Sequence, residues 1–370
     1  MKFIDLSAQQ KRIREKIDLG FKRVLDHGQY IMGPEIAAVE KRLAEFAGAR
    51  HALTCATGTD ALLMALMAYD VEPGDAILTT PFTFVATAEV VALLGAEPVF
   101  VDIDPDTFNI DPVKIQTAVE GAKKRGLTPR GIIPVDLFGL PADFDHIFKV
   151  AKENELFVLD DACQGFGGVY KGKKLGSVGD VTAASFFPAK PLGVYGDGGA
   201  VFTDDDSLAD EMRSIRIHGM GSDKYDNVRI GINGRFDTLQ AVVLDAKLDI
   251  FDEEILLRQK VADAYSARLK HAVKLQAAPD GLKSVWAQYS MTSPKKGAIV
   301  SALTEAGIPT AVYYPIPLHL QTAFKYLGRS AGDFPVSEKI AKEIFSVPMH
   351  PYLSEADIEA VSSAILSAVK

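Results

Sequence analysis

Lys190 is the residue of this chain whose surroundings best suit nucleophilic chemistry. It lies between two prolines in the segment SFFPAKPLG (185–193), and glycines continue to position 199. An ammonium group held in a rigid, apolar turn should have a lowered pKa, and the neutral amine that results is a nucleophile. A surface lysine in an ordinary turn is the alternative that this segment alone leaves open.

Two further features stand at the ends of predicted strands. Asp160 and Asp161 end the apolar stretch LFVL (156–159), where a buried carboxylate needs a cationic partner. Alternation along the strand turns one of the two inward, without indicating which. Thr57-Gly58-Thr59 precedes a predicted helix, whose first N–H groups can bind a phosphate. A threonine that only caps the helix is the alternative.

A phosphate-binding turn, a carboxylate and a lysine are the parts that a pyridoxal phosphate site requires. The lysine forms a Schiff base, and the acid pairs with the pyridinium nitrogen. Ser185 could reach the same phosphate, and Phe84 could cover the ring or be a core aromatic. Arg235 suits a carboxylate or phosphate, although a solvated arginine is the more usual case.

Strand and helix patterns alternate around these residues. The helix patterns follow Thr59 and cover about 84–94, 111–124 and 143–153. The strand patterns cover 51–55, 76–80, 97–103, 131–136, 156–161, 180–187 and 198–203. This order predicts an α/β fold, a mostly parallel sheet flanked by helices with its chemistry beyond the carboxyl ends of the strands.

A long helical pattern at about 236–272 predicts a connection to a second, smaller α+β domain. The expected elements of that domain are strands at 285–292 and 308–314 and helices at 294–306 and from Ser354. We therefore expect a large cofactor-binding domain over residues 1–247, including an N-terminal helical segment, and a small C-terminal domain over 248–370.

Composition and charge exclude several functional classes. The 370 residues carry a net charge of −9, so the basic surface expected of a nucleic-acid or membrane-surface protein is missing. Apolar stretches fall short of the roughly 20 residues that span a bilayer, and the start lacks a signal-peptide pattern. Two cysteines fit a reducing compartment, so the cytoplasm is expected.

Two segments resemble other cofactor-binding motifs, but each lacks one residue that its motif requires. Gly167–Lys174 resembles a phosphate loop, but lysine replaces its final hydroxyl residue, so an exposed β-turn is expected instead. Gly196–Gly199 lacks the third glycine of a dinucleotide fingerprint. The histidines and cysteines show no metal-ligand spacing, so no metal is expected.

The chain resembles the DegT/DnrJ/EryC1/StrS family of sugar-nucleotide aminotransferases over nearly its whole length. The segments that carry the resemblance are FIDLSAQQ (3–10), HGQYIMGPEI (27–36), CATGTDAL (55–62), PFTFVATAEV (81–90), DDACQ (160–164), SFFPAKPLGVYGDGGA (185–200), GINGRFDTLQA (231–241), YYPIPLHLQ (313–321) and SVPMHPYL (346–353). The resemblance implies a fold-type-I transferase dependent on pyridoxal phosphate, and a homodimer whose active sites are shared between subunits.

The resemblance also implies a role for each matching residue. Lys190 is the Schiff-base lysine and Asp161 the partner of the pyridinium nitrogen. The other residues expected to bind the cofactor are Gly58, Thr59, Phe84, Gln164, Ser185 and, from the partner subunit, Asn233. The residues expected on the substrate side are Arg235 (from the partner subunit), Tyr313, Tyr314 and His319.

The substrates implied are L-glutamate and a UDP-linked keto-sugar. The likeness is greatest to members that aminate UDP-2-acetamido-2-deoxy-3-oxo-glucuronate for surface polysaccharides such as O-antigen. Tyr313 stands where such members often carry histidine, Cys163 where alanine is common, and Thr57 where asparagine or serine is common. The alternatives are another keto-sugar nucleotide, a sugar dehydratase of the same fold and a non-catalytic sugar-nucleotide-binding protein. The dehydratases commonly carry histidine in place of the lysine, so Lys190 argues against the second.

Overall fold

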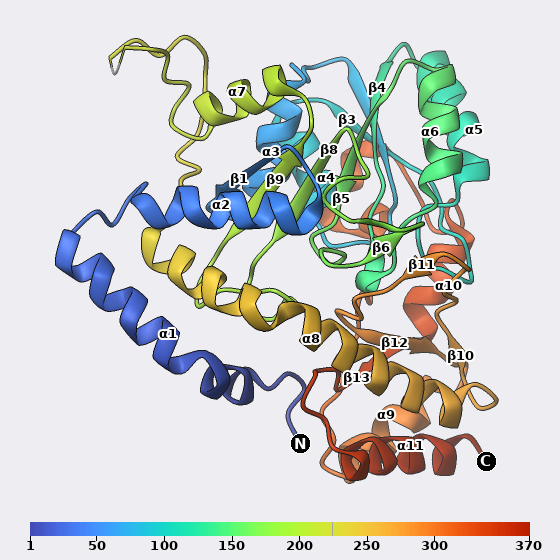
Figure 1. Cartoon of the computed structure of the whole chain (residues 1–370). Coiled ribbons are helices and arrows are strands. Elements are labelled where there is room, and N and C mark those ends of the chain that lie inside the picture. The colour runs from blue at the N-terminus through green and yellow to red at the C-terminus, as the bar shows by residue number, and fades with distance from the viewer. Residues whose placement is uncertain (224) are drawn as a thin grey trace.

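A seven-stranded sheet forms the centre of the computed structural model, which describes residues 1–223 and 225–370 (Figure 1). Its strand order is β1-β9-β8-β5-β4-β2-β3. β9 is antiparallel to both of its neighbours, and the remaining pairs are parallel. The strands are β1 (His51–Cys55), β2 (Asp75–Thr79), β3 (Glu97–Phe100), β4 (Thr128–Ile133), β5 (Phe157–Asp161), β8 (Val181–Ser185) and β9 (Gly199–Thr203).

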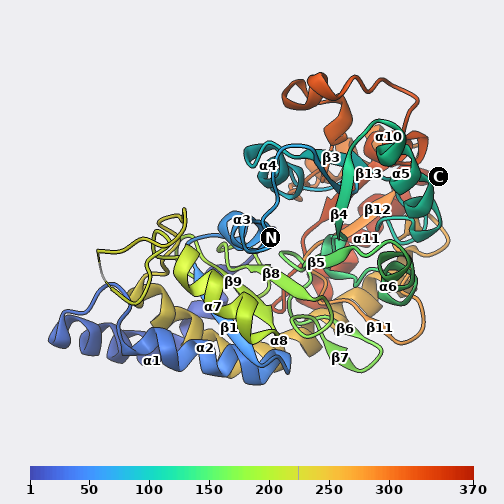
Figure 2. The same ribbon diagram turned by 90° about the horizontal axis from the view of Figure 1, so that it is seen from above.

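Helices cover both faces of this sheet, as the apolar strands require. Neighbouring residues alternate between the faces, so Ile77 and Leu78 belong to different core clusters. One face, here called the α3–α4 face, packs against α3 (Gly58–Ala68), α4 (Ala86–Leu93) and α7 (Asp206–Ile215). The opposite face packs against α5 (Pro112–Lys124), α6 (Phe144–Glu153), α1 (Leu6–His27), α2 (Pro34–Ala47) and part of α8 (Thr238–Leu269). Figures 1 and 2 both show α1 and α2 alongside α8.

The C-terminal part has its own antiparallel sheet and core. Its strands are β10 (Lys274–Leu275), β12 (Tyr289–Thr292) and β13 (Ile344–Val347), covered by α9 (Lys296–Glu305) and α11 (Glu355–Val369). The 32-residue helix α8 runs without a break through residue 247. Its residues pack into the first core up to Phe251 and into the second from Val261. The division into domains at 247/248 stays a prediction, and the change of core lies a few residues later.

Most expected elements are present, but the strand expected at 308–314 is wrong. Only Ala311 forms a bridge there, to Ser346. Pro309 has no N–H to donate to a ladder, and Tyr313 and Tyr314 pack instead against the core around Phe82. The turn expected within Gly167–Lys174 is confirmed as a hairpin of β6 (Val169–Tyr170) and β7 (Lys173–Lys174), which β11 (Leu282–Lys283) extends.

The segment between α9 and β13 lies against the part of the molecule that contains the seven-stranded sheet. It contains two short 3-10 helices, Leu318–Leu320 and Thr322–Leu327, and α10 (Pro335–Glu343). Asp102, just after β3, caps α10 by accepting the backbone N–H groups of Val336 and Ser337 at 3.0 and 2.9 Å. None of the described helices is long and apolar enough to cross a membrane.

Candidate active site

Strand β5 brings two consecutive carboxylates to the carboxyl end of the sheet and sends them to opposite faces. Asp161 follows Leu159 on the α3–α4 face and is 4% exposed. Its Oδ2 accepts the Thr87 hydroxyl at 2.8 Å, and its Oδ1 accepts the backbone N–H of Cys163 at 3.2 Å. Asp160 faces the other way and bonds Thr182. Asp161 is therefore the carboxylate on the side where α3 and α4 begin.

Thr87 holds Asp161 and was not identified from the sequence. It lies in the first turn of α4 and also bonds Thr83, four residues earlier, at 3.1 Å. The sequence offered one signal for this contact: Thr83 and Thr87 are four positions apart in PFTFVATAEV (81–90), a spacing at which side chains meet on a helix. Its partner could not be found in the sequence, because Asp161 is 74 positions away.

The turn before α3 leaves no space for a side chain at Gly58. Thr57 is the N-cap of α3, since its hydroxyl accepts the backbone N–H of Asp60 at 2.9 Å. The capping alternative is thus correct for Thr57, while Gly58 and Thr59 form the first turn behind it. A Cβ at Gly58 would lie 2.6 Å from the Cβ of Ser185 and 3.0 Å from the Cys163 sulfur. This close approach fits the phosphate of a bound cofactor resting on the helix N-terminus.

Replacing Gly58 with valine should therefore weaken cofactor binding by at least about tenfold. The new side chain would push Ser185 and the helix N-terminus apart, and such overpacking costs about 1–3 kcal/mol. Titration of the apo protein with pyridoxal phosphate measures the effect. Gly121→Ala is the matched control, because nothing lies within 4 Å of that position. Unchanged affinity in the Gly58 variant would contradict a phosphate-binding cradle formed by Gly58, Thr59 and Ser185, here called the Gly58 cradle.

Lys190 lies in a tight turn between β8 and β9. Its backbone N–H donates to the Phe187 carbonyl at 2.9 Å. The Phe186 N–H donates to the Gly198 carbonyl, and the Phe186 carbonyl accepts the Val194 N–H, each at 2.7 Å. A Cβ at Gly193 would lie 2.4 Å from the Phe187 oxygen, so the turn requires glycine there. Burial lowers the pKa of the Lys190 ammonium, and the nearby Cys163 thiol and Asp161 carboxylate oppose this lowering only in part. The turn therefore holds a lysine that loses its proton more readily than an exposed lysine does.

Gln164 and Tyr314 join the strand ends to the C-terminal part of the chain. The Gln164 amide donates to the Tyr314 hydroxyl at 3.0 Å, and its carbonyl accepts the backbone N–H of Phe138 at 2.9 Å. Burial raises the pKa of Tyr314. The ring of Phe84 lies 6.4 Å from that of Tyr314 and is 55% exposed, so one face remains open to a ligand. Tyr313 is half-buried beside Tyr314.

His319 is enclosed, although the sequence places it in the stretch expected to line the sugar. Its side chain is 0% exposed, and its Nε2 lies 3.2 Å from a Glu338 oxygen. Its ring packs against Phe334 at 4.7 Å. His319 therefore fastens the loop to α10, and direct contact with a substrate would need a rearrangement.

Asn233 and Arg235 lie beside the turn between β1 and α3, which contains Ala56. Gly234 between them accepts the backbone N–H of Ala56 at 3.0 Å. Asn233 is exposed, and the Arg235 Nε is buried with no hydrogen-bond partner among the described residues. Neither side chain is bonded to Lys190 or Asp161 within the part of the chain that the structure describes. A buried guanidinium nitrogen of this kind is suited to an anion supplied from outside the chain.

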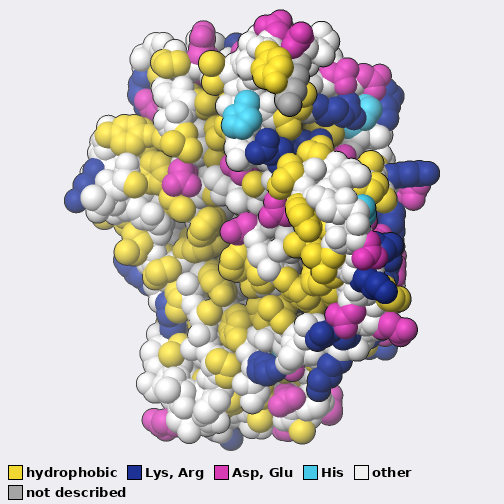
Figure 3. Space-filling view, turned by 90° about the vertical axis from the view of Figure 1, so that its left-hand side faces the viewer, with side chains coloured by type: hydrophobic (Ala, Val, Ile, Leu, Met, Phe, Trp, Pro, Cys, Tyr) yellow, Lys and Arg dark blue, Asp and Glu magenta, His cyan; other side chains and the backbone are white. Residues whose placement is uncertain are grey.

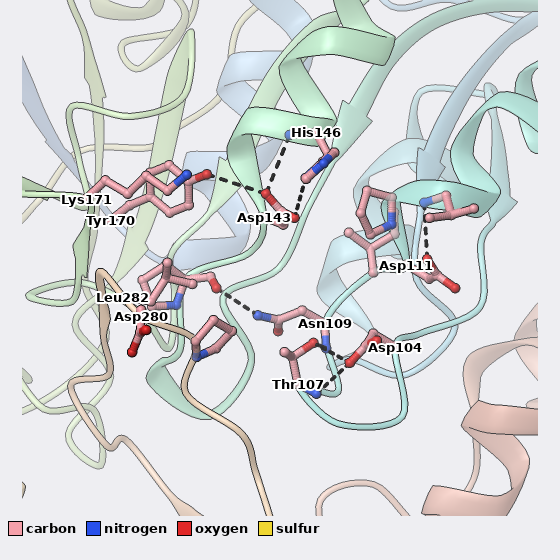
Figure 4. A pocket seen from close by; sticks show the side chains of 15 residues that line it. Asp104, Thr107, Asn109, Asp111, Asp143, His146, Tyr170, Lys171, Asp280 and Leu282 are labelled. Atoms are coloured by element: carbon pink, nitrogen blue, oxygen red, sulfur yellow. Dashed lines mark hydrogen bonds and ion pairs between the residues drawn. The ribbon is translucent and has the colours of Figure 1, made fainter.

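A separate pocket of about 380 Å³ lies beside α5 and α6, and none of the predicted site residues lines it (Figure 4). Three of its four acidic side chains already have hydrogen-bond partners. Asp104 accepts the N–H groups of two nearby residues, Asp111 caps α5, and Asp143 bonds His146 and the N-terminus of α6. Across residues 1–223 and 225–370, no cluster of three or more His, Cys, Asp or Glu could hold a metal ion.

Comparison with known proteins gives one consistent result. The sequence profile of the DegT/DnrJ/EryC1/StrS aminotransferase family matches residues 11–366. UDP-2-acetamido-2-deoxy-3-oxo-D-glucuronate aminotransferase of Pseudomonas aeruginosa is 49% identical over 99% of both chains. A DegT DnrJ EryC1 StrS aminotransferase from Brucella abortus is 49% identical, with a TM-score of 0.97 over 100% of this chain and 99% of that one. NtdA from Bacillus subtilis, solved with bound cofactor PMP, is 28% identical, with a TM-score of 0.89 over 99% of this chain and 83% of that one.

Proposed function

The chain belongs to the DegT/DnrJ/EryC1/StrS aminotransferase family and is a pyridoxal-phosphate-dependent sugar aminotransferase, and on this premise we propose its substrates. It transfers the amino group of L-glutamate to carbon 3 of UDP-2-acetamido-2-deoxy-3-oxo-glucuronate, for surface polysaccharides such as O-antigen. The observation that carries the proposal is the arrangement of Lys190, with its lowered pKa, near Asp161 and the Gly58 cradle. The identity of 49% to the Pseudomonas enzyme supports this choice of sugar.

The proposed roles rest on the family resemblance, and the places of the side chains agree with them. Gly58, Thr59 and Ser185 would bind the cofactor phosphate, Phe84 would cover the ring, and Gln164 would lie near the ring. Asp161 stabilises a proton on the ring nitrogen, fixed by its bond to Thr87. The bound cofactor supplies an electron sink that lets a proton leave the donor's α-carbon.

Lys190 is proposed to do two things. Its amine would hold the cofactor, and once free it would carry a proton to and from the α-carbon of the donor. A lowered pKa serves both steps, because a larger share of the amine is neutral at the working pH. Tyr313 and Tyr314 are proposed to border the sugar, and His319 to hold their loop in place through Glu338.

We also propose that two copies of the chain form a dimer and share their active sites, in the cytoplasm. Apolar side chains are exposed on the face that contains α1 and the loop before α8 (Figure 3). They include Leu25, Tyr30, Ile31, Val228 and Ile230. The backbone carbonyl of Tyr30 accepts the backbone N–H of Thr238 at 3.0 Å. This surface therefore adjoins the segment that carries Asn233 and Arg235. Covering it with a second copy would bring both residues to the interface.

Replacing Arg235 with glutamine should slow one half-reaction by about 10–10²-fold, because a charged hydrogen-bonding group is lost. Slowing of the glutamate half-reaction would mean that Arg235 binds the donor, and slowing of the sugar half-reaction would mean that it binds the uronate. Single-turnover kinetics separates the two. No effect on either half-reaction would contradict its proposed role.

Mixing two impaired variants tests whether the sites are shared. Lys190→Ala and Arg235→Gln subunits, refolded together, should be more active than either variant alone, because each hybrid dimer contains one intact site. The mixture would show no gain over the Arg235→Gln protein if Arg235 served the site of its own subunit.

Assay with the 3-oxo-glucuronate and with the corresponding sugar lacking the carboxylate tests the substrate. Equal kcat/KM for the two would favour the alternative keto-sugar.

A further inference from the structure

Two fully buried carboxyl groups lie behind Asp161 on the opposite face of the sheet. Asp136 follows β4 and Asp160 lies in β5, and both are 0% exposed. One oxygen of each has a partner: Asp136 Oδ1 accepts the backbone N–H of Ala142 at 2.8 Å, and Asp160 Oδ2 accepts the Thr182 hydroxyl at 3.2 Å. The other oxygen of each, Asp136 Oδ2 and Asp160 Oδ1, is buried with no further partner in the described chain.

These two carboxyl groups are within hydrogen-bonding reach of each other. Two carboxylates in contact cannot both stay ionised in an enclosed site, and a buried oxygen without a hydrogen-bond partner is costly. One proton between the two groups removes both problems, since a protonated carboxyl can donate to an ionised one. Burial raises the pKa of Asp136 well above its usual range and that of Asp160 to about 7.

Backbone packs closely against both side chains. A Cβ at Gly165 would lie 2.4 Å from the Cβ of Asp136, and one at Gly179 would lie 2.9 Å from the Cβ of Asp160. The charged group that acts on both is the carboxylate of Asp161. The pair is therefore enclosed by backbone and held at close range.

The pair is also tied to the backbone of Asp161. The Asp136 N–H donates to the Asp161 carbonyl at 3.1 Å, and the Asp161 N–H donates to the Pro134 carbonyl at 2.9 Å. A hydrogen bond between Asp136 and Asp160 would fasten the same two strand ends a third time, through their side chains. Movement at either member would shift the peptide that aims Asp161.

We propose that Asp136 and Asp160 share one proton across their facing oxygens and that this pair positions Asp161. The pair holds the end of β5 in register and places one negative charge behind Asp161 instead of two. A second charge there would repel the Asp161 carboxylate and disturb its placement against a protonated ring nitrogen. The link to cofactor binding rests on the proposed role of Asp161, whereas the shared proton itself does not.

Infrared spectroscopy tests the shared proton without substrate or cofactor. At pH 8.5 ordinary carboxyl groups are ionised, so a protonated carboxyl shows its own C=O stretch, which shifts in D₂O. The difference spectrum between the wild type and Asp136→Asn should contain this band, because the amide replaces the proton donor. Absence of the band from the difference spectrum would overturn the proposal.

Two substitutions at Asp136 test the positioning. Asn keeps the shape and a donor for Asp160, so the cofactor dissociation constant and kcat should stay within about threefold of the wild type. Leu removes the donor and leaves Asp160 unpaired, so both should worsen by at least about tenfold. Equal behaviour of the two variants would refute the positioning role.

Asp160→Asn provides the second measurement if Asp136→Leu does not fold. Its infrared band should also be lost, because the new amide keeps its oxygen toward Thr182 and donates its N–H to an ionised Asp136. A band that persists in this variant would contradict the shared proton. The outcomes also separate this inference from the proposed function. A protonated pair in a protein that does not aminate any UDP-keto-sugar would leave the shared proton established and the choice of substrate wrong.

Discussion

Lys190→Ala should lower kcat by at least about 10²–10⁴-fold, the usual contribution of a positioned proton-transfer group. The variant loses the amine that attaches the cofactor and also the group that moves the proton afterwards. The turn itself should survive, because its hydrogen bonds are made by the backbone of Phe186, Phe187 and Lys190. Steady-state turnover and the amount of cofactor retained after dialysis measure the two losses.

Chemical rescue distinguishes this loss from misfolding. A small primary amine such as methylamine should restore part of the activity of Lys190→Ala, since it can accept and return the proton. Lys173→Ala is the matched control, because that lysine is exposed in the β6–β7 hairpin and should leave turnover unchanged. Near-normal turnover by a cleanly purified Lys190→Ala protein would remove the basis of the mechanism.

Asp161→Asn should slow the glutamate half-reaction by about 10²–10³-fold, similar to the loss of one electrostatic contact at a developing charge. The amide keeps the size of the side chain but cannot stabilise a proton on the ring nitrogen. Cofactor affinity should also fall by about 10–10²-fold, because a charge-assisted hydrogen bond is lost. Stopped-flow absorbance with L-glutamate gives the rate, and titration gives the affinity.

Thr87→Val separates the charge of Asp161 from its placement. This variant keeps the carboxylate and loses only the 2.8 Å bond to Oδ2. We expect a rate loss of about 10–10²-fold at most, since one hydrogen bond to a charged group contributes about 1.5–3 kcal/mol. An Asp161→Asn protein with unchanged half-reaction kinetics would show that the ring nitrogen has another partner.

The sheet was predictable from the sequence because its signals are local. Apolar runs such as 51–55 and 156–161 correspond to β1 and β5 within a residue, and the connecting helices have the expected positions. The strand expected at 308–314 failed for the opposite reason. Its apolar residues fill a distant core around Phe82, and such packing leaves no periodic pattern in the segment itself.

The candidate site was predictable in its residue types but not in its contacts. The sequence left Asp160 and Asp161 equivalent, and only the sheet shows that Asp161 meets Thr87 while Asp160 meets Thr182. The pairing of Asp160 with Asp136 joins two strand ends and has no local signal. The enclosure of His319 by α10 was hidden for the same reason.

The most direct test of the account is the visible absorbance spectrum of the purified protein before and after addition of L-glutamate. The account predicts a yellow band from the cofactor bound to Lys190, and its loss as glutamate converts the cofactor to the pyridoxamine form. A band that ignores glutamate would contradict the proposed donor. No band after incubation with pyridoxal phosphate would contradict the role of Lys190 and every step that depends on it.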